Sequence, residues 1–193
     1  MRLVMASANP HKATEMSDVL RDAMPSAEVV PRPAHLGDVA EDGETLAHNA
    51  LIKARFVCAA AGEPAIADDT GLEVDALGGA PGVYSARYAG PEADPVANVA
   101  KLLSALAHVP LAQRTARFRT VVAVVFDDGR EVLAEGVVEG AIAQSPRGDQ
   151  GFGYDPVFIP DEAAHLTFAE MSTDAKNRIS HRGRALRALA EHL

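Results

Sequence analysis

Residues 115–138 read TARFRTVVAVVFDDGREVLAEGVV, and this stretch predicts a β-hairpin. Its two arms, 115–126 and 131–138, are rich in β-branched residues, which favour extended structure. The four residues between them, Asp-Asp-Gly-Arg, have the composition of a tight turn. At least part of the sheet is therefore expected to be antiparallel.

Strands and helices alternate upstream of this hairpin. Three short apolar runs predict strands, three segments with apolar residues at 3- and 4-residue spacing predict helices, and a terminal helix closes the chain. The strands are expected at 2–6, 27–31 and 65–67, and the helices at 11–24, 45–61, 95–107 and 182–192. Gly-rich loops are expected over 71–91 and 145–156. This order predicts an α/β fold with a mixed sheet and helices on both faces.

The length and charge limit the class of protein. The 193 residues suit one domain spanning 1–193, with 48% hydrophobic and 23% charged residues. The formal net charge of −9 argues against a nucleic-acid-binding face or an anionic membrane surface. It leaves room for a small anionic ligand in a basic cleft.

The single cysteine, Cys58, excludes an internal disulfide and is expected to be a buried, inert thiol. No apolar run is long enough for a transmembrane helix, and the first residues do not resemble a signal peptide. We therefore expect a cytoplasmic protein.

A first candidate site is the strand-to-helix turn formed by Ser7, Ala8, Asn9, Pro10, His11 and Lys12. Small residues and the amides of a helix N-terminus can hold phosphate oxygens, and Lys12 adds a full charge. The turn lacks the glycines of a P-loop. The alternative is an ordinary capped helix with Ser7 or Asn9 as the cap, and these residues alone favour it.

Carboxylates form the second and third candidates. Glu41 begins an acidic segment followed by Asn49 and Lys53, which lie one helical turn apart and could face one cleft. Asp68 and Asp69 follow a buried strand, where a charge needs a partner, and their oxygens suit magnesium or the activation of a water. The structural alternatives are an acidic helix start for the first segment and a cap or turn role for Asp69.

Two further candidates lie near the C-terminus. Phe152, Gly153, Tyr154 and Asp155 belong to a glycine-aromatic segment that suits stacking on a base, or a hairpin with core aromatics. The segment 176–182 carries hydrogen-bond donors that could recognise a carbonyl on a base edge, or it could be a solvated helix start. Together the five segments describe a site for a nucleoside triphosphate.

These segments, in this order, resemble the inosine/xanthosine triphosphate pyrophosphatase family nearly end to end. The resemblance rests on SANPHK at 7–12, NALIKA at 49–54, ADDTGL at 67–72, LGGAPGVYSARY at 77–88, GFGYDP at 151–156 and ISHRG at 179–183. Two positions depart from the family pattern. Ala8 stands where the family commonly has glycine, and Ala40 stands where it often has an acid, which leaves Glu41 as the candidate second metal ligand.

The resemblance implies hydrolysis of ITP, dITP or XTP to the monophosphate and pyrophosphate with Mg²⁺. It also implies a homodimer of elongated α/β subunits, each with a substrate cleft between two lobes. Asp69 would be the general base and, with Glu41, a metal ligand. Ser7 to Lys12 and Lys53 would bind the phosphates, with Thr70 beside the substrate. Phe152 to Asp155 would form the base pocket, and the purine 6-oxo edge would be read by Lys176, His181 and Arg182.

Overall fold

A computed structural model describes residues 1–37, 39–163 and 165–193. The chain divides into two compact units. Unit 1 consists of 1–69, 120–136 and 181–193, and unit 2 consists of 70–119 and 137–180. Each unit has its own hydrophobic core, because the buried apolar residues cluster within the units.

The described residues form one mixed sheet with the strand order β2-β1-β3-β5-β6-β7, and β4 pairs with β3. Strand β1 is parallel to both β2 and β3, whereas β4 is antiparallel to β3 and β7 is antiparallel to β6. The strands are β1 Arg2–Met5, β2 Glu28–Val30, β3 Ala65–Val74, β4 Pro81–Gly82, β5 Thr115–Val125, β6 Glu131–Ile142 and β7 Phe158–Pro160.

Five α-helices are found in the described parts of the chain. They are α1 Pro10–Ala23, α2 Leu46–Ala61, α3 Pro95–Ala105, α4 Thr173–Ile179 and α5 His181–Ala190. Helix α2 begins after its N-cap Thr45 and ends at Gly62, which adopts the left-handed conformation typical of a helix C-cap. None of these helices is both long and apolar enough to cross a membrane.

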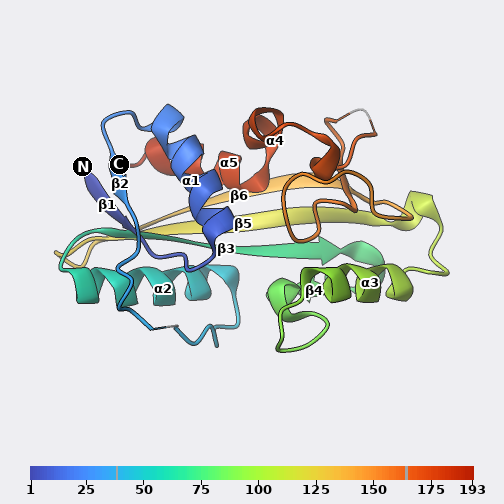
Figure 1. Cartoon of the computed structure of the whole chain (residues 1–193), viewed down its shortest axis with the longest axis horizontal. Coiled ribbons are helices and arrows are strands. Elements are labelled where there is room, and N and C mark those ends of the chain that lie inside the picture. The colour runs from blue at the N-terminus through green and yellow to red at the C-terminus, as the bar shows by residue number, and fades with distance from the viewer. Residues whose placement is uncertain (38, 164) are drawn as a thin grey trace. The chain divides into compact units, whose positions relative to one another are not determined.

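The strands of unit 1 separate two apolar layers. In Figure 1, α1 and α5 cover one face of these strands and α2 covers the opposite face. Alternate residues of one strand supply the two layers: Ile66 packs with α1 and α5, whereas Ala65 and Ala67 pack with α2. This is the period-2 alternation of a strand that is buried on both sides.

Unit 2 has a core that is rich in aromatic side chains. Phe118, Phe158 and Phe168 contact one another, with ring centroids 4.7 Å apart for Phe118 and Phe158, 5.2 Å for Phe158 and Phe168, and 6.2 Å for Phe118 and Phe168. In Figure 1, α3 and α4 lie on opposite sides of the strands of this unit. Leu102 and Leu106 of the α3 segment join the same core.

The structure confirms the predicted α/β fold, the mixed sheet and the hairpin, whose turn is closed by the Phe126 amide donating to the Arg130 carbonyl. Two predictions are wrong. The strand that begins at Ala65 does not stop before Asp68 but continues to Val74, and the expected loop 71–91 contains this strand end and β4. Strand β7 and helix α4 were not predicted.

Candidate active site

Asp68 and Asp69 lie inside β3, so their side chains point to opposite faces of the sheet in unit 1. Asp68 shares the face of Ile66, towards α1 and α5, and Asp69 shares the face of Ala67, towards α2. The two residues are 1% and 6% exposed. The structural alternative for Asp69, a turn or cap role, is therefore wrong, and each acid has a separate set of partners.

Asp69 is held by two side chains of α2. Asn49 Nδ2 donates to Asp69 Oδ2 at 3.2 Å, and Lys53 Nζ donates to Asp69 Oδ1 at 3.1 Å. Lys53 Nζ also lies 3.3 Å from Glu41 Oε2. The spacing of Asn49 and Lys53 by one helical turn therefore does turn both side chains to one side, as the sequence predicted.

Asp68 is the centre of a buried charge cluster on the other face. Arg182 donates to Asp68 Oδ2 from Nε at 3.1 Å and from Nη2 at 3.0 Å, and its Nη1 donates to Glu15. Lys12 Nζ lies 3.5 Å from Asp68 Oδ2. Arg182 itself is only 2% exposed. The cluster therefore joins α1, β3 and α5 through opposite charges.

These neighbours determine the charge states. Burial disfavours the charged form of Asp68, but Lys12, Arg182 and Lys53 outweigh burial and hold its pKa below the ordinary value. Burial likewise opposes the charge of Lys53, yet Asp69 and the other nearby acids raise its pKa. Both groups are therefore charged at neutral pH.

The turn at residues 7–12, which is the first candidate site for phosphate, is a capped helix start. Asn9 Oδ1 accepts hydrogen bonds from the amides of His11 at 3.0 Å and Lys12 at 3.3 Å, and Pro10 is the first helical residue. Ala8, Asn9, Pro10 and His11 are exposed, whereas Ser7 and Lys12 are half-buried. Ser7 and Ala8 also line an open hollow of about 600 Å³ in unit 1. The structure thus has the cap that the sequence offered as an alternative to phosphate binding.

The predicted base-binding residues lie in unit 2. Lys176 Nζ donates to Asp155 Oδ2 at 2.6 Å and lies 5.0 Å from the centroid of the Phe152 ring. The same Asp155 oxygen accepts from the Phe152 amide at 2.8 Å, which closes the turn containing Gly153. Tyr154 is buried and donates from its hydroxyl to the Ser85 carbonyl at 2.9 Å.

The donor stretch at 176–182 is divided between the units. Lys176 lies on α4 in unit 2, whereas His181 and Arg182 begin α5 in unit 1, and both are buried. Thr70 is half-buried in unit 2. Glu15 was not predicted. Its position on α1, three residues after Lys12, places both on one helix face, but only the fold brings Arg182 to them.

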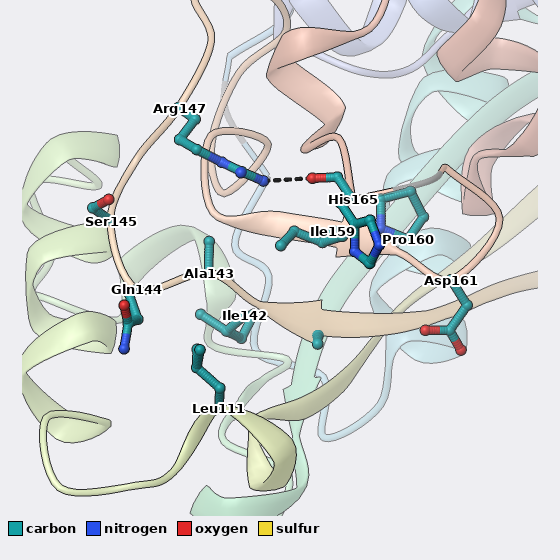
Figure 2. A pocket seen from close by; sticks show the side chains of 11 residues that line it. Leu111, Ile142, Ala143, Gln144, Ser145, Arg147, Ile159, Pro160, Asp161 and His165 are labelled. Carbon is teal, nitrogen blue, oxygen red and sulfur yellow. Dashed lines mark hydrogen bonds between the residues drawn. The ribbon is translucent and has the colours of Figure 1, made fainter.

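A separate pocket of about 620 Å³ lies in unit 2 (Figure 2). Leu111, Ile142 and Ile159 lie close together in it, and Arg147 Nη2 donates to the His165 carbonyl at 2.6 Å. None of the residues that line it is a predicted site residue.

The fold and site define an α/β protein with buried acid–base clusters around one strand. A protein-family model described as the Ham1 family matches residues 3–192. A relative named dITP/XTP pyrophosphatase from Thioalkalivibrio sulfidiphilus is 50% identical, and the alignment covers 100% of this chain and 98% of the relative. A relative of the same name from Desulforamulus reducens is 48% identical, with 100% and 96% covered.

Solved structures of similar proteins have the same fold over nearly the whole chain. A HAM1 protein from Coxiella burnetii has a TM-score of 0.88 and 40% identity, covering 100% of this chain and 98% of that one. A nucleoside-triphosphatase / dITP/XTP pyrophosphatase from Mycobacterium abscessus has a TM-score of 0.75 and 43% identity, covering 98% and 97%. The chain therefore belongs to the Ham1 family.

Proposed function

We propose that this protein hydrolyses the non-standard purine nucleoside triphosphates ITP, dITP and XTP to the monophosphate and pyrophosphate. Two findings support the proposal. The chain belongs to the Ham1 family, and relatives named dITP/XTP pyrophosphatase align with its full length. The structural observation that carries it is the cluster of Asp69, Lys53 and Glu41 on one face of β3. It combines a carboxylate that can accept a proton with an ammonium group that can neutralise phosphate.

Asp69 is the proposed general base. It would accept a proton from a water molecule that attacks the α-phosphorus, and pyrophosphate would leave. Lys12 and Lys53 would offset the charge that develops on the leaving group. The raised pKa of Lys53 keeps this side chain positive at neutral pH. Ser7 to His11 would bind the triphosphate beside Lys12, and Thr70 would lie next to the substrate.

The residues present fit a magnesium ion. Lys53 Nζ already places a positive charge 3.1 Å from Asp69 Oδ1 and 3.3 Å from Glu41 Oε2. Carboxylate oxygens are the ligands that Mg²⁺ prefers, commonly one or two of them together with substrate phosphates. The described residues contain no group of three or more His, Cys, Asp or Glu side chains placed to hold a metal ion, so Asp69 and Glu41 would have to hold it together with substrate phosphates. When bound, Mg²⁺ would add positive charge at the phosphate oxygens.

The proposed base pocket is formed by Phe152, Gly153, Tyr154 and Asp155, with the Phe152 ring as the stacking surface. Lys176, His181 and Arg182 are the proposed readers of the 6-oxo group. Adenine carries a donor at that position, so a buried donor facing it would be left without an acceptor. Arg182 is held by Asp68 and Glu15, and this role requires it to exchange at least one of those bonds.

The test is pyrophosphate release from ITP, dITP, XTP, ATP, GTP and a modified pyrimidine triphosphate, with Mg²⁺ or with EDTA. We expect ITP, dITP or XTP to be the best substrate and EDTA to abolish release. Asp69→Asn should abolish turnover while its circular dichroism and unfolding curve stay those of a folded protein. Asp75→Asn, which removes an exposed acid in unit 2, is the control and should keep wild-type rates. Wild-type turnover by Asp69→Asn would refute the assignment of the base.

The proposal includes a homodimer in the cytoplasm, where such triphosphates would arise. The dimer is tested by light scattering of the purified protein during gel filtration. A monomeric mass at micromolar concentration would contradict that part of the proposal and leave the reaction untouched.

A further inference from the structure

Asn49 is a buried amide that joins two segments of unit 1. Its side chain is on α2, and the residue is 1% exposed. Nδ2 donates to Asp69 Oδ2 at 3.2 Å, and Oδ1 accepts from the Gly43 amide at 2.8 Å. One side chain therefore connects β3 with the acidic segment that contains Glu41.

The Gly43 backbone approaches this amide closely. A Cβ atom at Gly43 would lie 2.6 Å from Asn49 Oδ1 and 3.0 Å from the His48 ring. Carbon atoms do not approach an oxygen this closely, so a side chain at position 43 would displace the amide or the segment. The absence of a side chain at Gly43 thus allows the hydrogen bond to Asn49.

These contacts close a ring. Asp69 is bonded to Asn49 through Oδ2 and to Lys53 through Oδ1, Lys53 contacts Glu41, and Glu41 lies two residues before Gly43. Lys53 contributes a positive charge, which is paired with Asp69 and Glu41 and which a phosphate can attract. Asn49 contributes a neutral amide whose donor and acceptor ends are both defined by their partners. The amide can therefore keep its place when the charges in the ring change partners.

We propose that Asn49 is a positioning residue for the reaction. It sets the orientation of the Asp69 carboxylate and holds the Glu41 segment at a fixed place relative to it. The inference rests on the proposed function, because it assigns Asn49 a role in presenting the proposed base and the proposed metal ligands. Residues that orient a ligand or a base commonly contribute about 10- to 100-fold to affinity or activity.

Asn98 provides a matched control. Like Asn49, it is the fourth residue of its helix, is buried, and uses both ends of its amide. Its Oδ1 accepts from the Ala89 amide at 2.6 Å, and its Nδ2 donates to the Ala86 carbonyl at 2.9 Å. Asn98 therefore anchors backbone alone and lies in unit 2, so it reports what a purely structural buried amide contributes.

The experiment compares Asn49→Leu, Asn49→Asp and Asn98→Leu with the wild type, using the best substrate found for the wild type. Kinetic constants are measured under conditions where urea unfolding shows each variant to be folded. We expect both Asn49 variants to lose about 10- to 100-fold in kcat, with a much smaller change in KM. Asn98→Leu should keep kcat close to wild type although its stability falls.

The Asn49→Asp variant distinguishes the role of the amide's acceptor from the role of its donor. It keeps an acceptor for the Gly43 amide, so it should fold, but it places an oxygen against Asp69. Wild-type kcat in Asn49→Asp would overturn the proposal, and so would equal losses of kcat in Asn49→Leu and Asn98→Leu. Gly43→Ala should lower kcat as well, and its effect should not add to that of Asn49→Leu because both break the same contact. Additive losses of kcat would show that Gly43 and Asn49 do not act through one shared contact.

A second readout does not depend on turnover. Binding of Mn²⁺ in the absence of nucleotide, followed by its electron paramagnetic resonance signal, should be about 10- to 100-fold weaker in Asn49→Leu than in the wild type. Unchanged Mn²⁺ affinity would refute the effect of Asn49 on the metal ligands. If the wild type releases no pyrophosphate from any triphosphate, the proposed function fails, and this measurement still tests Asn49.

Discussion

Replacing Arg182 with methionine should destabilise unit 1 strongly. The guanidinium is 2% exposed and donates twice to Asp68 and once to Glu15. Removing one partner of a buried ion pair typically costs about 3–5 kcal/mol, because the remaining charges stay buried without compensation. Methionine retains a flexible stem of similar length, so the loss should reflect the missing charge rather than a cavity.

The structure refines this magnitude. After the substitution Glu15 loses the guanidinium, which is destabilising. Asp68 keeps Lys12 at 3.5 Å, and because this partner compensates part of its charge, we expect the lower half of that range. For a chain of this size, 1 kcal/mol corresponds to about 2–4 °C in Tm. The expected decrease in Tm is therefore on the order of 6–16 °C for a loss of about 3–4 kcal/mol.

The assay is unfolding followed by circular dichroism, with urea for the free energy of unfolding and with heat for Tm. Arg55→Met is the control, because Arg55 makes two bonds to Glu131 at 2.6 and 2.9 Å but its side chain is 51% exposed. An exposed pair contributes about 0–1 kcal/mol. Neutralising the acids as well, in Arg182→Met with Asp68→Asn and Glu15→Gln, should recover part of the stability. If Arg182→Met loses no more stability than Arg55→Met, the buried cluster does not hold unit 1 together as argued.

Two further variants test the packing of each unit by the same unfolding measurement. Gly136→Ala would place a Cβ 2.1 Å from the His181 carbonyl, which should cost about 1–3 kcal/mol, whereas Gly37→Ala meets nothing within 4 Å and should be nearly neutral; equal values would contradict the close approach. Tyr154→Phe removes the bond to the Ser85 carbonyl and should cost about 0.5–1.5 kcal/mol at neutral pH. Burial raises the pKa of Tyr154 above its value of about 10 in the unfolded chain, so the wild type should lose this contribution as pH rises above 10 and the variant should not; parallel pH profiles would refute it.

The sequence predicted the alternation of strands and helices but not the length of β3. A strand was expected only over 65–67, because two adjacent acids usually end a buried strand. The strand continues because Asp69 meets Lys53, 16 residues away, and Asp68 meets Arg182, 114 residues away. Local periodicity contains no information about such distant partners.

Short elements were missed for a related reason. Strand β7 has three residues and α4 has seven, so each contains fewer than about two periods of its amphipathic pattern, which is too little for a periodicity signal. Both depend on neighbours: Phe158 of β7 packs against two other phenylalanines, and Lys176 of α4 is paired with Asp155. The candidate residue types could therefore be found in the sequence, whereas their pairing required the fold.

The two adjacent acids of β3 have different partners, and we expect them to have different roles. Because a strand alternates its side chains, Asp68 and Asp69 face different helices although they are neighbours in the chain. Asp68 is enclosed by Arg182 and Lys12, which joins α1 and α5 to the sheet and contributes to stability. Asp69 faces a neutral amide and one lysine, and in the proposed function its carboxylate accepts the proton of the attacking water. A substitution at Asp68 should therefore act first on the free energy of unfolding, and one at Asp69 first on turnover.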